Sequence, residues 1–230
     1  MKYKHLFFDL DHTLWDFETA SLNTWKSLWE TQQLQTRIPD GFDTFFKVYS
    51  AHNEEMWKLF RERKITREEL RWKRIWKTFQ DFNVYDAPLA HSLSDAYLEI
   101  LPTQSALIPY ALEVLEYCKG RYQMHLITNG FERTQKLKIE HAGIASYFSE
   151  IITSEMSDSI KPHPEIFRYA MRAAHAHCAE CLMIGDAFEA DILGAIGVGM
   201  DTVYFNPQKL QHEEKPTFQI ESLKELIALL

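Results

Sequence analysis

The sequence predicts an α/β fold in which a parallel sheet is covered by helices and an all-helical segment is inserted after the first strand. From about residue 103 onward, short apolar runs alternate with helical stripes, whereas residues 16–100 show helical spacing throughout. Continuous apolar strands separated by helices are typical of a parallel sheet buried on both faces. We therefore expect an α/β core formed by residues 1–15 and 103–230 and a helical domain formed by residues 16–102.

The bulk composition fits a globular protein and excludes several classes of partner. The 230 residues are 46% hydrophobic and carry a net charge of −8, so no overall basic field draws the chain to a nucleic acid polymer or an anionic membrane. No segment approaches the ~18 apolar residues of a membrane span. The apolar run near the N-terminus stops at Asp9, too early for a signal peptide, and three cysteines give no disulfide framework. We expect a cytoplasmic protein that is a monomer or a weak homo-oligomer.

The first strand is expected to start with the apolar run that ends at Asp9 and to extend through Leu10, and the helical insert follows it. Apolar residues at helical spacing over 22–29 predict the first helix of the insert. A second helix is expected over 42–63. Thr66-Arg67-Glu68-Glu69 has the pattern of a capping box that opens a third helix, and Asp86-Ala87-Pro88 opens a fourth.

The remainder of the chain alternates between strands and helices. Gly143, for example, is a stop signal for the helix that precedes it. The predicted strands cover 123–128, 150–153, 181–184 and 202–205, and the predicted helices cover 109–119, 132–142, 164–175, 187–196 and 223–230.

Two carboxylates, Asp9 and Asp11, stand at the end of the first strand. Residues i and i+2 of an extended strand point to the same side, so the two acids should project together from the carboxyl edge of the sheet, where ligands bind in open α/β folds. Acids this close repel one another unless a cation lies between them or one is protonated. The pair therefore needs a partner that the rest of the chain must supply.

Polar groups also follow the other strands. Thr128-Asn129-Gly130 ends the second strand, and its hydroxyl and backbone N–H groups at a helix N-terminus suit an anion. Lys161 is followed by Pro162, which restricts it to an extended geometry and so fixes its ammonium group. Gly185-Asp186 ends another apolar strand, with Asp191 five residues further on.

Together these groups have the composition of a phosphoryl-transfer site. Carboxylate oxygens, with waters and a substrate phosphate, are the ligands that Mg²⁺ prefers. A lysine and a helix N-terminus balance the remaining phosphate charge. We therefore expect Mg²⁺ as the cofactor and a small phosphorylated metabolite as the substrate.

The four motifs resemble, in order, the signature motifs of the haloacid dehalogenase-like hydrolase superfamily. They are Asp9-Leu10-Asp11-His12-Thr13, Ile127-Thr128-Asn129, Lys161-Pro162, and Gly185-Asp186 with Asp191. The resemblance implies a Rossmann-like parallel sheet of strand order 5-4-1-2-3, with the helical insert as a C1-type cap domain. The longer strings around these motifs look most like pyrimidine 5′-nucleotidases that act on noncanonical nucleotides.

The resemblance implies catalytic roles for the matched residues. Asp9 would be the nucleophile that attacks phosphorus and becomes an aspartyl phosphate. Asp11 would protonate the leaving oxygen and then deprotonate the water that hydrolyses the intermediate. Thr128 and the amide of Asn129 would bind the transferring phosphoryl oxygens, and Lys161 would neutralise those oxygens and the nucleophile.

The resemblance also implies the metal ligands. These are the side chain of Asp9, the backbone carbonyl of Asp11 and the side chain of Asp186. Asp191 would bind through water or orient the other ligands. Two positions depart from the family's usual pattern without touching a catalytic residue: Tyr110 stands where glycine is common, and His163 where aspartate is common.

The function expected from the sequence is Mg²⁺-dependent hydrolysis of a phosphomonoester through an aspartyl phosphate, with a nucleoside 5′-monophosphate as substrate. A sugar-phosphate phosphatase and a phosphomutase remain open as alternatives on the same core. A 2-haloacid dehalogenase is disfavoured because it has no alkoxide for Asp11 to protonate. A non-catalytic phosphate-binding protein is disfavoured because every catalytic position is intact.

Overall fold

The computed structural model describes residues 2–230 and divides into two compact units. One unit is formed by the chain up to Phe17 together with Ser105–Leu230, and the other by Glu18–Gln104. The first is called the α/β unit and the second the helical unit.

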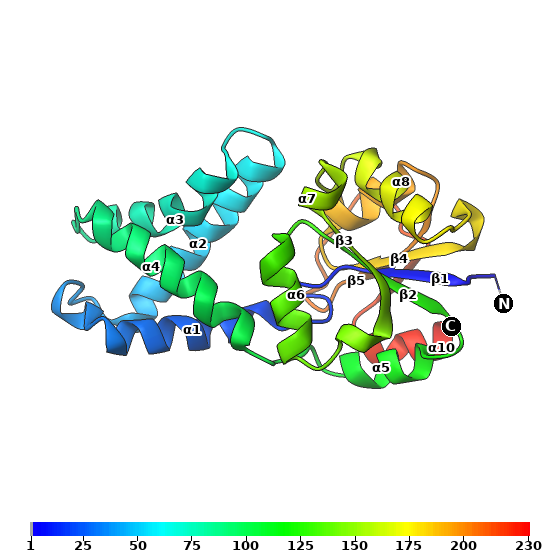
Figure 1. Cartoon of the computed structure of the whole chain (residues 1–230), viewed down its shortest axis with the longest axis horizontal. Coiled ribbons are helices and arrows are strands. Elements are labelled where there is room, and N and C mark those ends of the chain that lie inside the picture. The colour runs from blue at the N-terminus through cyan, green and yellow to red at the C-terminus, as the bar shows by residue number, and fades with distance from the viewer. Residues whose placement is uncertain (1) are drawn as a thin grey trace. The chain divides into compact units, whose positions relative to one another are not determined.

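A six-stranded sheet of order β3-β2-β1-β4-β5-β6 forms the centre of the α/β unit, and all its neighbouring strands are parallel (Figure 1). The order of the first five strands is the predicted one. The sixth strand, at the edge, was not predicted, because two of its three residues are exposed and it lacks an apolar run. The strands are β1 His5–Phe8, β2 Gln123–Thr128, β3 Phe148–Thr153, β4 Cys181–Gly185, β5 Asp201–Phe205 and β6 Phe218–Ile220.

Helices cover both faces of this sheet. Helix α8 lies over one face, and α5 and α10 lie on the other (Figure 1). The helices of the unit are α5 Ala111–Cys118, α6 Glu132–His141, α7 Ser154–Ser157, α8 Pro164–Ala173, α9 Gly194–Ile196 and α10 Leu226–Leu229.

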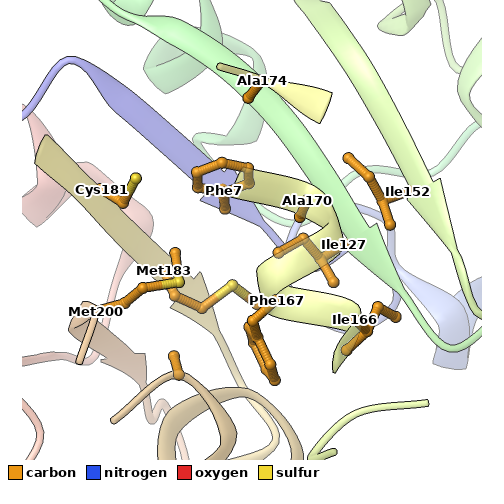
Figure 2. Packing of buried hydrophobic residues seen from close by; sticks show 11 residues of the cluster. Phe7, Ile127, Ile152, Ile166, Phe167, Ala170, Ala174, Cys181, Met183 and Met200 are labelled. Carbon is orange, nitrogen blue, oxygen red and sulfur yellow. The ribbon is translucent and has the colours of Figure 1, made fainter. Parts of the chain in front are cut away.

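Helix α8 is held on the sheet by an apolar cluster that Figure 2 shows from close by. Its Ile166 and Phe167 pack with Phe7 of β1 and Ile127 of β2, and all four are fully removed from solvent. Burying a side chain of this size contributes roughly 1.5–3 kcal/mol. The cluster lies beneath the strands whose carboxyl ends carry the predicted site, so it fixes the scaffold of that site.

The helical unit contains four α-helices around an aromatic core. Trp25 lies at its centre, with ring centroids 4.9 Å from Phe45, 4.6 Å from Tyr49 and 5.4 Å from Tyr97. The capping box predicted at Thr66 is confirmed, because its hydroxyl accepts from the N–H of Glu69 at 3.2 Å. The helices are α1 Phe17–Thr31, α2 Phe42–Arg61, α3 Arg67–Asp81 and α4 Ala87–Ile100.

Two predicted elements differ in detail. The first strand ends at Phe8 rather than extending through Leu10, and His12 has a φ of 65° in the tight turn that follows. The helix predicted over 187–196 is a π-helical turn over Phe188–Leu193 followed by α9. Both differences lie next to predicted site residues and help to aim their side chains.

None of the helices formed by residues 2–230 is long and apolar enough to span a membrane. The three cysteines are free thiols, in agreement with the absence of a disulfide framework expected from the sequence.

Candidate active site

The predicted residues come together because β1 lies between β2 and β4 in the sheet. Phe8, the last residue of β1, pairs with Leu126 on one side and Ile184 on the other. The N–H of Asp9 donates to the carbonyl oxygen of Ile184 at 2.9 Å. Parallel strands in this register end at one edge, so the groups that follow β1, β2 and β4 meet there.

Lys161 is the cation at the centre of the acidic group. Its Nζ pairs with Asp9, lies 2.6 Å from Asp191 Oδ1 and donates to the carbonyl oxygen of Ile127 at 2.8 Å. Its side chain is only 3% exposed. Burial alone would lower the pKa of Lys161, but the charges of Asp191 and Asp9 outweigh it and raise the pKa above its ordinary value. The ammonium group is therefore permanently charged and fixed in place.

One lysine does not balance the acids around it. Burial raises the pKa of Asp9 well above its ordinary value, Lys161 opposes this, and Asp191 and Asp186 add to it. Burial and the charge of Asp191 likewise raise the pKa of Asp186 to about 6. The group therefore has a surplus of negative charge that a bound cation would relieve.

The same three acids fit a hard divalent cation. Carboxylate oxygens of Asp9, Asp186 and Asp191 all lie within 4.8 Å of one another. Oxygen ligands converging with net negative charge are what Mg²⁺ requires. The residues present therefore suit the metal that the sequence predicts.

Asp191 is held by contacts on both of its oxygens. Oδ1 pairs with Lys161, and Oδ2 accepts from the N–H of Ala187 at 3.0 Å. The π-helical turn brings it against the backbone of Gly185, where a Cβ atom would lie 2.5 Å from the Asp191 Cγ. Only glycine leaves room for this carboxylate at the end of β4.

Asp186 is oriented by Thr13, whose hydroxyl donates to Asp186 Oδ1 at 2.8 Å and accepts from the Asp186 N–H at 3.1 Å. Thr13 is fully buried in the turn after β1. We did not assign it a role from the sequence, although its place two residues after Asp11 was a signal. It ties the turn after β1 to the end of β4.

Asp11 belongs to a separate set of contacts. Lys138 Nζ lies 2.6 Å from its Oδ1, and Gln135 Nε2 donates to its Oδ2 at 2.9 Å. Burial would raise the pKa of Asp11, but the charge of Lys138 and the hydrogen bonds from Lys138 and Gln135 outweigh it and lower the pKa below its ordinary value. The two acids after β1 are therefore stabilised by two different lysines, not by one shared cation. Sequence reasoning missed Gln135 and Lys138.

The polar groups that follow β2 make hydrogen bonds to other groups of the protein. The carboxamide of Asn129 accepts from the backbone N–H of Lys161 at 2.7 Å and donates to its carbonyl oxygen at 3.0 Å, so it holds the lysine's backbone. The buried Thr128 hydroxyl oxygen accepts from the N–H of Gly130 at 3.1 Å and from Gln135 at 2.7 Å. The Gly130 N–H, predicted to bind phosphate, is thus already used by Thr128.

Comparison with known proteins identifies the family of this chain. Residues 3–199 match the haloacid dehalogenase-like hydrolase family. The chain is 31% identical to pyrimidine 5′-nucleotidase YjjG of Escherichia coli, over all of this chain (100%) and 99% of the relative. It is 29% identical to pyrimidine 5′-nucleotidase PynA of Streptococcus pneumoniae, over 100% of this chain and 96% of the relative.

A solved structure extends the similarity to the whole fold. HAD-hydrolase YfnB of Bacillus subtilis, bound to magnesium, superposes with a TM-score of 0.90 at 27% identity and covers 100% of this chain and 99% of that one. With its parallel sheet, its acids at the ends of β1 and β4 and its fixed lysine, this chain belongs to the haloacid dehalogenase-like hydrolase family.

Proposed function

We propose that the chain is a Mg²⁺-dependent phosphomonoesterase that works through an aspartyl phosphate on Asp9. The observation that carries the proposal is the division of the two acids after β1. Asp9 lies with Lys161, Asp186 and Asp191, whereas Asp11 lies apart from them with its own donors. Two neighbouring carboxylates in different environments suit two different chemical roles.

In the first step an oxygen of Asp9 attacks phosphorus, and the bond from phosphorus to the ester oxygen breaks. The leaving alkoxide takes a proton from the protonated form of Asp11, which the negative charge of a bound phosphate would favour over the carboxylate held by Lys138 and Gln135. In the second step a water attacks the aspartyl phosphate and gives a proton to Asp11, which releases phosphate and regenerates both carboxyl groups. Lys161 neutralises charge on the nucleophile and on the phosphoryl oxygens in both steps.

The side chains of Asp9 and Asp186 and the backbone carbonyl of Asp11 would hold Mg²⁺, with Asp191 acting through water or as a support for the other ligands. When bound, the cation supplies positive charge that lowers the repulsion between Asp9 and an incoming phosphate. Thr128 and the backbone N–H of Asn129 would receive the phosphoryl oxygens.

We infer a nucleoside 5′-monophosphate as the substrate and residues 16–102 as a cap domain. The two relatives named as pyrimidine 5′-nucleotidases support this substrate class. We also infer that the enzyme acts in the cytoplasm on small metabolites.

The test is phosphate release from purified protein, with and without Mg²⁺. A panel of pyrimidine and purine 5′-monophosphates, sugar phosphates and 4-nitrophenyl phosphate is compared by kcat/KM. We expect Mg²⁺-dependent hydrolysis that is fastest with a pyrimidine nucleotide and is abolished in Asp9→Asn. Asp40→Asn, the same change at an exposed position of the helical unit, should leave the activity intact.

Other outcomes point elsewhere. Preference for sugar phosphates would overturn the nucleotide assignment while keeping the chemistry. Halide release from a 2-haloacid without phosphate release would favour a dehalogenase. Full activity in Asp9→Asn would overturn the nucleophile.

A further inference from the structure

Helix α6 carries two buried polar side chains that both contact one carboxylate. Gln135 is 1% and Lys138 3% exposed, which is unusual for these residue types. They are three residues apart and so lie on the same face of the helix. Both donate to the carboxylate of Asp11.

The two donors divide the Asp11 carboxylate between them. Lys138 Nζ donates to Oδ1 at 2.6 Å, and Gln135 Nε2 donates to Oδ2 at 2.9 Å. A single donor would leave the carboxyl plane free to rotate, whereas one donor on each oxygen fixes both its position and its plane. The second donor therefore adds orientation to the charge that the first supplies.

Each donor is itself fixed. The ammonium group of Lys138 lies 4.4 Å from the ring centroid of Trp15 and 5.6 Å from that of Phe17, so two aromatic rings hold it by cation–π attraction. The same Gln135 Nε2 that reaches Asp11 also lies 2.7 Å from the hydroxyl oxygen of Thr128. A Cβ atom at Gly130 would lie 2.5 Å from Gln135 Nε2, so glycine there makes room for the amide.

We propose that Gln135 and Lys138 are positioning residues that clamp Asp11 in the orientation needed to exchange a proton with the leaving-group and water oxygens. The role rests on the phosphomonoesterase function proposed above. The clamp also links Asp11 to Thr128, so the proton-transfer group and the phosphate-binding hydroxyl share one amide. Neither residue touches the substrate in this role.

The clamp on Asp11 should matter more for alkyl phosphates than for aryl phosphates, which would not hold for a contact that only supports the fold. An alkoxide is a poor leaving group and needs a proton as it departs, whereas 4-nitrophenolate is a stable anion that leaves without one. Loosening Asp11 should therefore harm hydrolysis of an alkyl phosphate much more than hydrolysis of 4-nitrophenyl phosphate. Damage to the fold or to phosphate binding would harm both esters alike.

The experiment measures kcat/KM for uridine 5′-monophosphate, an alkyl ester, and for 4-nitrophenyl phosphate, an aryl ester, at saturating Mg²⁺. Glycerol 2-phosphate replaces uridine 5′-monophosphate if the enzyme hydrolyses it faster. This constant covers the first phosphoryl transfer, in which the leaving group departs. We expect Lys138→Met, which keeps an apolar stem against Trp15 and Phe17, to lower the ratio of alkyl to aryl kcat/KM at least about tenfold. Lys138→Arg, which restores a cation, should recover most of that ratio.

Lys136→Met is the matched control, because Lys136 lies on the same helix, is exposed and pairs with Glu132 at 2.6 Å. It should leave both constants unchanged. If Lys138→Met does not fold, Gln135→Met decides, since it removes the donor to Oδ2 and should lower the same ratio. Equal losses with both esters, or an unchanged ratio, would overturn the clamp. A wild-type protein that hydrolyses neither ester would overturn the proposed function and this role together.

Discussion

His125 Nε2 lies 3.2 Å from His5 Nδ1 inside the sheet, and the His125 ring stacks on Phe7 with centroids 4.7 Å apart. Burial and the neighbouring His5 lower the pKa of His125 from 6.5 to about 4. The pair therefore stays neutral at physiological pH. This pair makes the stability of the α/β unit sensitive to acid.

As the pH falls from 7 to 4.5, we expect stability to decrease, because the unfolded chain binds a proton at His125 that the folded chain refuses until about pH 4. This one group should cost about 2.5 kcal/mol of unfolding free energy at pH 4.5. Urea unfolding at the two pH values measures the loss. The variant His125→Gln should lose about 2.5 kcal/mol less unfolding free energy than wild type between pH 7 and 4.5. The exposed His141→Gln should lose as much as wild type. Parallel pH profiles for wild type and His125→Gln would contradict the assignment.

Tyr110 is the N-cap residue that precedes α5, and its φ of 69° lies in the left-handed region. A residue with a Cβ atom costs roughly 1–2 kcal/mol there. We expect Tyr110→Gly to be about 1 kcal/mol more stable than Tyr110→Ala, which also removes the ring but keeps the strain. Thermal unfolding of the two variants measures the difference, and Tyr110→Ala being the more stable would refute it.

Gly185→Ala should disable the site by displacing Asp191. The added Cβ atom would lie 2.5 Å from Asp191 Cγ, and Asp191 is a partner of Lys161. We expect phosphate release to fall on the order of a hundredfold and stability to fall by about 1–3 kcal/mol. Gly197→Ala is the control, since its added Cβ would come no closer than 3.4 Å to another atom. Wild-type activity in Gly185→Ala would show that Asp191 does not need its present position.

Mg²⁺ should stabilise the folded chain through the acids at the ends of β1 and β4. A ligand at a hundred times its Kd adds about 2.7 kcal/mol, so the Tm should rise with Mg²⁺ concentration. Asp186→Asn should reduce that rise, because it removes charge from the group of three carboxylates. Asp40→Asn should keep it. An equal rise in Asp186→Asn and wild type would place the cation elsewhere. The readout is unfolding temperature and does not depend on turnover.

Much of the scaffold could be predicted because its cause is local. A buried parallel strand needs a continuous apolar run, and the carboxyl end of such a run is where polar groups collect. This pattern alone predicts Asp9, Thr128 and Asp186 as polar groups at strand ends. The edge strand β6 escaped it because Phe218 and Gln219 are exposed and break the apolar pattern.

The parts that could not be predicted depend on contacts distant in sequence. Lys138 is 127 residues from Asp11, and nothing in the composition of α6 indicates which carboxylate it would meet. The π-helical turn that carries Asp191 differs from an α-helix by its hydrogen bonds rather than by its apolar spacing. The sequence thus located the groups at the strand ends but not the side chains that orient them.

The position of β1 in the middle of the sheet also determines when the protein can fold. This strand is made first, yet both of its neighbours, β2 and β4, are made only after the whole helical unit. During translation the four consecutive helices can form from nearby contacts, while the apolar run His5–Phe8 waits without a partner. Asp9 is therefore made before the helical unit, and its contacts with Ile184 and Lys161 can form only after that unit has been made.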